Sequence, residues 1–248
     1  MFLPIGDEPN PHHLPVVTVA IIAVNVAVFL LLTLPLSTRA ADPANPLLME
    51  YLRALLPNLP PGISPEQVAS RVSAYDLVVF DWGYRPGDPS AVSLITAMFL
   101  HGGFMHLFGN MLYLWIYGNN VEHRLGGPAF LFWYLATGVA ATLFHGLFNM
   151  GSQIPLVGAS GAISGVLGFY LVWFPRHVVK IWMFLIPFYV GVVRISATIV
   201  LIMYLVLDNL LPMLMSGGQG GVAHGAHIGG FIAGMAVAFA MRLMPRKA

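Results

Sequence analysis

The stretch Gly158-Ala159-Ser160-Gly161-Ala162-Ile163-Ser164-Gly165 begins an apolar run that continues to Phe174. No acidic or basic residue interrupts this run from Ser160 onward, so the segment predicts a helix inside a membrane. Its glycines Gly161 and Gly165 form a small-xxx-small pair, a pattern that lets two helix backbones approach closely. The serine at the start of the helix is a candidate functional residue, because a polar group is costly in lipid.

The composition supports a membrane protein. Of the 248 residues, 58% are hydrophobic and 8% are charged, against roughly a quarter charged in a soluble domain. The 11 basic and 10 acidic side chains give a net charge of +1, which offers no broad surface for nucleic acid. The sequence contains no cysteine, which excludes disulfides, thiolate metal sites and a cysteine nucleophile.

Six apolar stretches predict an all-α polytopic bundle of six transmembrane helices in the lipid bilayer. They are Val16–Leu36; Phe104–Tyr117, preceded by the apolar Ala91–Leu100; Pro128–Phe148; Ser160–Phe174; Ile195–Leu211; and Val222–Leu243. The Val178–Val193 segment is also apolar, but Pro187 and Gly191 interrupt it and basic residues bracket it. We interpret it as an interfacial loop, with a seventh span as the alternative.

The loops predict the orientation of the chain. Residues 37–92 form a large first extramembrane loop, with a short amphipathic helix expected around Pro65–Val79, after Ser64. With the N-terminus inside, seven Lys and Arg residues lie in inside loops and tail, and four lie outside, all in the long loop. Residues 1–15 and 244–248 are therefore predicted to be cytoplasmic, flanking a membrane domain at 16–243. A bacterial inner membrane is the simplest expectation.

Three clusters of uncharged polar residues lie in the first parts of the second, fourth and sixth spans. These spans run in the same direction, so we expect the clusters to meet at one depth, in the outer part of the membrane. The clusters are His101-Gly-Gly-Phe-Met-His106-Leu-Phe-Gly-Asn110, the stretch around Ser160, and His224-Gly-Ala-His227-Ile-Gly-Gly230.

This set of side chains predicts an acyl-transfer site, with no cofactor and no metal. A histidine, His227 or less favourably His224, can take the proton of the Ser160 hydroxyl and make it a nucleophile. The backbone N–H at the helix N-terminus can stabilise an oxyanion. His106 and Asn110, four apart on one helix face, can donate further hydrogen bonds. No acidic residue adjoins either histidine, so we expect a Ser-His dyad, and peptide hydrolysis as its reaction.

These motifs resemble the rhomboid intramembrane serine proteases, from about Leu94 to the C-terminus. The matching pieces are GASG at 158–161, His101-x4-His106-x3-Asn110, VEHRLG at 121–126 and GAHIGG at 225–230. The resemblance implies a six-helix core and cleavage of transmembrane protein substrates. It also implies a Ser160 nucleophile, a His227 base, and an oxyanion hole made by the Ser160 N–H, His106 and Asn110. The supporting residues that it implies are His101, Gly158, Gly161, Glu122 and Arg124.

The resemblance further implies that Arg39–Leu100 is the first loop of the family, partly embedded in the outer leaflet, and that Glu122 and Arg124 tie the second and third helices together. The sequence departs from it at Ser164, where some members have a tyrosine that stacks on the catalytic histidine. The packing that orients His227 would then come from elsewhere. A Trp-Arg pair near His101 is also missing, and Trp82 with Arg85 is the nearest such grouping.

Other functions stay open at this stage. A catalytically silent relative could bind and retain transmembrane clients, although such a protein would be expected to have lost Ser160 or His227. The histidines of the first and third clusters could instead hold a metal, and Asp208, in the fifth span, could steady a histidine. A small-solute transporter would need broken helices paired in two inverted halves, which the sequence does not display.

Overall fold

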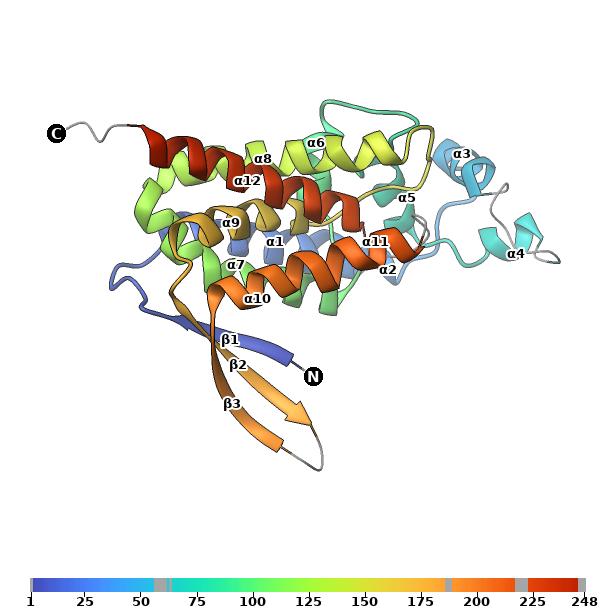
Figure 1. Cartoon of the computed structure of the whole chain (residues 1–248). Helices are drawn as coiled ribbons and strands as arrows, with labels where there is room; N and C mark the ends of the chain where they lie inside the picture. The colour runs from blue at the N-terminus through green and yellow to red at the C-terminus, as the bar shows by residue number, and fades with distance from the viewer. Residues whose placement is uncertain (1, 56–61, 63, 186–188, 217–222, 245–248) are drawn as a thin grey trace.

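The computed structural model describes residues 2–55, 62, 64–185, 189–216 and 223–244, in which long helices lie side by side and a small sheet projects from one end (Figure 1). Two of the helices contain a π-helical turn. The bundle helices are α1 (Val16–Val28) with η1 (Phe29–Thr33) and α2 (Leu34–Ser37), α7 (Phe104–Leu125), α8 (Gly127–Phe148), α9 (Ser160–Trp173), α10 (Ala197–Leu205) with η4 (Val206–Leu210) and α11 (Leu211–Ser216), and α12 (His224–Leu243).

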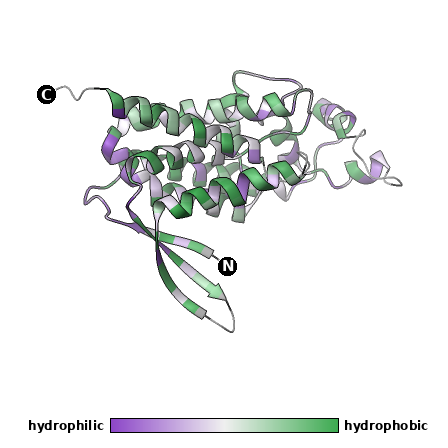
Figure 2. Cartoon of the chain, viewed as in Figure 1, coloured by the Kyte–Doolittle hydropathy of each residue, from purple (hydrophilic) through white to green (hydrophobic). Residues whose placement is uncertain are grey.

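Helices form at each predicted span. Within the described chain, four are long and apolar enough to cross a membrane by length and composition: Val16–Ser37, Gly127–Phe148, Ala197–Met215 and His224–Leu243. Hydrophobic residues follow the bundle helices, and hydrophilic residues gather at helix ends and in the first loop (Figure 2). The protein is therefore a polytopic helical membrane protein, while the count of six spans stays a prediction.

The α9 helix is the centre of the bundle. Its residues from Gly161 to Tyr170 are all buried, and it packs against α12, α8 and α7. With 14 residues it is about 21 Å long, whereas α7 and α8 have 22 residues each. Ser160 is its first residue.

Glycines bring α9 and α12 into backbone contact. A Cβ added to Gly234 would lie 2.0 Å from the Gly165 carbonyl oxygen, and one added to Gly230 would lie 2.1 Å from that of Gly161. The close approach predicted from the Gly161 and Gly165 pair is confirmed. Gly229 instead faces α8, where its added Cβ would lie 2.5 Å from Phe144.

A three-stranded antiparallel sheet replaces two segments that the sequence analysis assigned differently. Its strands are β1 (Phe2–Glu8), β2 (Val178–Leu185) and β3 (Tyr189–Ser196), in the order β1-β2-β3. The segment predicted as a loop, with a seventh span as the alternative, forms strands, so both assignments are wrong and the fold is not all-α. Its interfacial position stays a prediction. Val179 and Ile181 are buried against the bundle while Trp182 is exposed, so the segment alternates as a strand does.

The first loop has more structure than predicted. It contains α3 (Pro46–Leu55), α4 (Pro65–Ala69), α5 (Ala74–Trp82), α6 (Ser93–Thr96) and the 3-10 turn η3 (Ala97–Phe99). The single helix predicted around Pro65–Val79 is two helices, because Ser73 forms a second capping box after the one at Ser64. Arg85 joins parts of the loop through Glu50, Asp88 and the Phe80 ring, and it donates to the Gln153 side chain outside the loop.

Candidate active site

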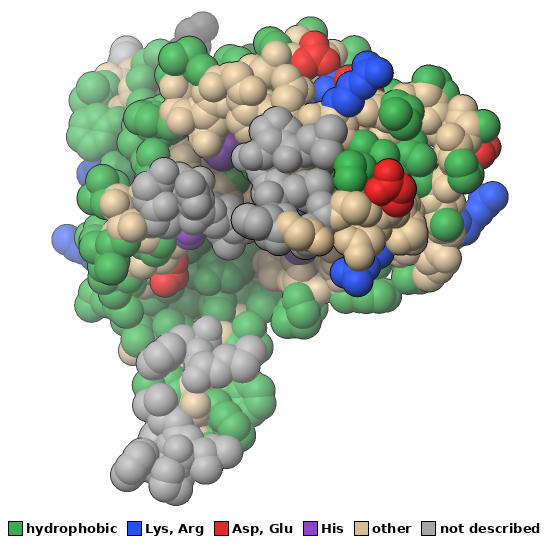
Figure 3. Space-filling model, turned by 90° about the vertical axis from the view of Figure 1, so that its right-hand side faces the viewer, with side chains coloured by type: hydrophobic (Ala, Val, Ile, Leu, Met, Phe, Trp, Pro, Cys, Tyr) green, Lys and Arg blue, Asp and Glu red, His purple; other side chains and the backbone are tan. Residues whose placement is uncertain are grey.

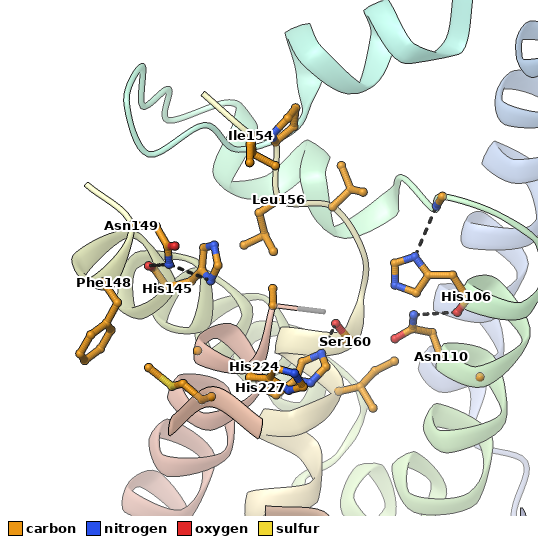
Figure 4. Close-up of a pocket in the computed structure, with 18 of the residues that line it drawn as sticks. His106, Asn110, His145, Phe148, Asn149, Ile154, Leu156, Ser160, His224 and His227 are labelled. Atoms are coloured by element: carbon orange, nitrogen blue, oxygen red, sulfur yellow. Dashed lines mark hydrogen bonds between the residues drawn. The ribbon is translucent and has the colours of Figure 1, made fainter. Parts of the chain in front are cut away.

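A hollow of about 900 Å³ opens at the N-terminal ends of α7, α9 and α12. Ser160, His227, His106 and Asn110 all line it, and their side chains point into it from three helices (Figure 4). His145 and His224 also lie in its wall. Figure 3 views the molecule from this end, and histidine side chains (purple) are visible there at the surface. The structure thus brings together residues that lie more than a hundred positions apart.

Ser160 and His227 are in direct contact. The Ser160 Oγ lies 2.7 Å from the His227 Nε2, which is hydrogen-bonding distance. Ser160 is the first residue of α9 and His227 is in the first turn of α12. The glycine contacts between these two helices bring their N-terminal turns together, so this pair depends on the helix packing described above.

Asn209 is a site residue that the sequence analysis missed. Its Oδ1 lies 2.6 Å from the His227 Nδ1, and the side chain is 1% exposed. The Asn209 Nδ2 donates to the Tyr204 carbonyl at 2.8 Å, which sets the orientation of the amide. Because an amide oxygen only accepts, His227 carries its proton on Nδ1 and presents the Nε2 lone pair to Ser160.

The neighbouring Asp208, which the sequence suggested might steady a histidine, is exposed and does not make this contact in the described structure. Asn209 lies in η4, a π-helical turn within an apolar span. A polar residue inside a span is itself a functional signal, and that signal would have found Asn209.

The Tyr204 ring packs against the face of the His227 ring. The two rings are stacked at an angle of 30°, with 6.3 Å between centroids, and the Tyr204 hydroxyl lies 2.7 Å from the Ser164 Oγ. The small, buried Ser164 is thus hydrogen-bonded to an aromatic residue from another helix. The orientation of His227, which the sequence left to packing from elsewhere, comes from α10 and η4.

His106 faces the nucleophile across Gly158. The His106 Nδ1 accepts from the Gly102 N–H at 3.3 Å, so its proton is on Nε2. A Cβ added to Gly158 would lie 2.7 Å from this Nε2, and the φ of Gly158 is +121°, so both space and backbone conformation require glycine here. The same added Cβ would lie 3.8 Å from the Ser160 Oγ, so the Nε2–H group lies close to Ser160.

Asn110 is bonded within its own helix. Its Nδ2 donates to the His106 carbonyl at 2.8 Å, and the amide has a second N–H on that nitrogen. The Ser160 backbone N–H is in the first turn of α9, where N–H groups have no intrahelical partner. These groups, with the His106 Nε2–H, are donors that can surround an anionic oxygen.

His101 and Gly161 contribute to the packing around the site. The fully buried His101 ring packs edge-on against His106, with 5.1 Å between centroids, and does not line the hollow in the described structure. The Tyr75 hydroxyl of α5 donates to the His101 carbonyl at 2.9 Å, which connects the first loop to this turn. A Cβ added to Gly161 would lie 2.8 Å from the Ala141 Cβ, so this glycine serves helix packing.

Glu122 ties α7 to a different helix from the one that the resemblance implies. Its carboxylate accepts from the backbone N–H groups of Val17, at 2.9 Å, and Thr18, at 2.7 Å, in the first turn of α1. It therefore caps α1 instead of joining α7 to α8. The Arg124 guanidinium lies 4.5 Å from the centre of a Trp173 ring, on α9.

The metal alternative finds no support in this geometry. In the part of the chain that is described, no group of three or more His, Cys, Asp or Glu side chains is arranged to hold a metal ion. The His227 nitrogens are instead engaged by Asn209 and Ser160.

Comparison with known proteins identifies relatives with similar sequences. RHOMBOID-like protein 5 of Arabidopsis thaliana is 31% identical over 153 residues, which are 62% of this chain and 45% of that protein. Rhomboid protein 1, mitochondrial, of Saccharomyces cerevisiae is 34% identical over 102 residues, 40% of this chain and 30% of that protein. Rhomboid protease GluP of Bacillus subtilis is 44% identical over 75 residues, 30% of this chain and 14% of that protein.

The chain thus spans less than half the length of each of these relatives. The match to the family as a whole is broader. The rhomboid domain covers residues 88–243, which include α7 to α12 and every residue of the hollow named above. Because this match extends over well more than half of the sequence, the chain belongs to the rhomboid family.

Proposed function

We propose that the protein is an intramembrane serine endopeptidase that hydrolyses peptide bonds in or near transmembrane segments of membrane proteins. The observation that carries the proposal is the 2.7 Å contact between the Ser160 Oγ and the His227 Nε2, with Asn209 holding the other ring nitrogen. Two relatives from Bacillus subtilis, Rhomboid protease GluP and Putative rhomboid protease YdcA, are named as proteases, which supports the same reaction class.

In this mechanism the His227 Nε2 takes the Ser160 proton as Oγ attacks the carbonyl carbon of the scissile bond. The Asn209 Oδ1 accepts from Nδ1–H throughout and so holds the ring in place. Negative charge develops on the carbonyl oxygen, where the Ser160 N–H, the His106 Nε2–H and Asn110 donate hydrogen bonds. His227 then protonates the leaving amine, and a water activated by the same nitrogen hydrolyses the acyl-enzyme.

The proposal includes six membrane crossings, with residues 1–15 and 244–248 on the cytoplasmic side and the hollow opening toward the other face. The location in a bacterial inner membrane stays a prediction. Because a helical peptide bond is shielded by its own helix, a substrate must unwind to reach Ser160. We therefore expect preferred substrates to carry small or helix-destabilising residues near that membrane boundary.

The test is cleavage of a labelled transmembrane substrate by the protein in liposomes. Ser160→Ala is expected to abolish cleavage. The matched control is Ser37→Ala, at an exposed serine at the end of α2, which is expected to keep full cleavage. Undiminished cleavage by folded Ser160→Ala would overturn the proposal. If the protein is instead a catalytically silent relative, the wild type should bind the substrate without cleaving it. The same assay therefore distinguishes a protease from a client-binding protein.

A further inference from the structure

A second hollow, of about 460 Å³, lies at the opposite ends of the helices that carry the candidate active site. The site is at the N-terminal ends of α7, α9 and α12, and this hollow is at their C-terminal ends. Its lining includes three arginines, a histidine and two aromatic residues, with Val172 and Pro175 beside them: Arg124, Arg176, Arg242, His177, Trp173 and Phe174.

The positive charges converge from three separate places. Arg124 is in the last turn of α7, Arg242 is in the last turn of α12, and Arg176 follows the end of α9 by three residues. No acidic residue lines the hollow among the described residues. Within that same set, the ion pairs are made by Arg85, Lys180 and Arg194, and none joins Arg176 or Arg242 to a carboxylate.

Favourable interaction with helix dipoles explains only part of this arrangement. A cation in the last turn of a helix interacts favourably with the helix dipole, which accounts for Arg124 and Arg242 separately. Arg176 lies outside any helix, so the dipole of α9 gives no reason for its position. Arg176 and Arg242 are like charges on one hollow and repel each other, and an anion between them removes that repulsion.

The aromatic wall holds one guanidinium in a defined place. The Arg124 guanidinium lies 4.5 Å from the centre of a Trp173 ring and 5.8 Å from that of Phe174. The Trp173 ring is itself held, because its Nε1 donates to the Ala238 carbonyl at 3.1 Å. These two ring contacts form one wall of the hollow, beside Arg176 and Arg242.

We propose that this hollow binds the phosphate group of an anionic membrane lipid. The hollow lies where the membrane helices end, which is the level of lipid headgroups, and basic pockets between helix ends suit such headgroups. Beside Arg242, the apolar side chains of Leu243 and Met244 are 75% and 64% exposed. They offer a surface for acyl chains that a free phosphate ion would not use.

The lipid would join the ends of α7, α9 and α12, which also carry His106, Ser160 and His227 at their other ends. It would therefore stabilise the helix packing on which the site depends. The inference does not rest on peptide hydrolysis, because it concerns binding alone.

The experiment measures thermal unfolding of the purified full-length protein in neutral detergent, titrated with phosphatidylglycerol, with phosphatidylcholine of the same acyl chains, or with inorganic phosphate. We expect phosphatidylglycerol to raise the unfolding midpoint at concentrations at least about tenfold below those that phosphatidylcholine requires. Equal responses to the two lipids would overturn the proposal. An equal response to inorganic phosphate would overturn the lipid assignment and leave a free-anion site.

Two variants test the location of the site. Arg176→Gln and Arg242→Gln are each expected to weaken the phosphatidylglycerol response about tenfold. Arg194→Gln is the matched control, because Arg194 is on β3, pairs with Glu8 and lies outside the hollow. Folded Arg176 and Arg242 variants that respond as the wild type does would exclude this hollow. Should they fail to fold, the comparison of lipids on the wild type still decides.

Discussion

At the scale of single residues, His227 is held on three sides. Its Nε2 contacts Ser160, its Nδ1 contacts Asn209, and the Tyr204 ring stacks on it. Tyr204 and Asn209 are also joined to each other, because the Asn209 amide donates to the Tyr204 carbonyl. The segment formed by α10 and η4 thus supplies the orientation that a dyad alone lacks.

Replacing Asn209 with Leu removes the acceptor at Nδ1 and lets the other tautomer, with the proton on Nε2, compete. We expect kcat to fall by about 10- to 100-fold, part of the 10²–10⁴ that general-base catalysis supplies, with little change in KM. Asn209→Asp, which keeps an acceptor oxygen there, should retain more activity. Asp208→Asn is the neighbouring control. Equal kcat values for Asn209→Leu and Asp208→Asn would show that Asn209 has no role.

The sequence predicted Ser160, His227, His106 and Asn110 because polar residues in apolar spans are few and these stand at matching depth. It did not predict Asn209, although Asp208 beside it drew attention. Asn209 carries the signal of a polar residue inside an apolar span, but the π-helical turn that contains it, Val206–Leu210, is not predicted by regular helix periodicity.

At the scale of elements, the α9–α12 interface depends on glycine. Gly165 and Gly234 meet with no room for a side chain, and Gly168 faces the backbone of α12 in the same way, with its added Cβ 2.2 Å from the Phe231 carbonyl oxygen. Small-xxx-small spacing made this contact predictable from the sequence.

Gly234→Ala places a methyl group against the Gly165 carbonyl and forces α9 and α12 apart. We expect it to destabilise the fold by about 1–3 kcal/mol, the usual cost of overpacking, and to lower activity by displacing His227 from Ser160. Thermal unfolding in detergent measures the first effect. Gly109→Ala in α7, whose added Cβ meets nothing within 4 Å, is the control and should be as stable as the wild type or more so. Equal melting temperatures for the two variants would contradict this role of Gly234.

The strands were harder to predict than the helices. In β2 both faces are largely apolar, because one packs on the bundle and the other carries exposed residues such as Trp182 and Phe184. The alternation of a half-buried strand is therefore hidden in the sequence, and an apolar run of this length fits a loop or a span equally well. The partner strand β1 lies 170 residues away, which no local pattern reveals.

At the scale of the whole molecule, Asp7 connects the N-terminal strand to the bundle. Its Oδ2 accepts from the Tyr170 hydroxyl of α9 and from the Asn120 Nδ2 of α7, the latter at 2.8 Å. The side chain is 2% exposed, and its Oδ1 has no hydrogen-bond partner among the described residues. Burial raises the pKa of Asp7 to about 6, against the opposing effect of hydrogen bonds from Tyr170, Asn10 and Asn120.

A carboxyl group with a raised pKa binds its proton more tightly in the folded state, so its contribution to stability is present at low pH and is lost as the pH rises through about 6. As the pH rises from 4.5 to 7.5, we expect the free energy of unfolding of the wild type to fall relative to that of Asp7→Asn, by roughly 2–3 kcal/mol at most. Melting temperatures of both proteins across this range measure the difference. Parallel curves would show that Asp7 does not titrate in this way.

The central claim is that Ser160 is a nucleophile activated by His227 in this chain. The most direct measurement is the rate and position of labelling by a serine-reactive fluorophosphonate, with the modified peptide located by mass spectrometry. The account predicts a label on Ser160, none in Ser160→Ala, and a rate reduced at least about 100-fold in His227→Ala. Labelling of another serine, or an unchanged rate in folded His227→Ala, would contradict it.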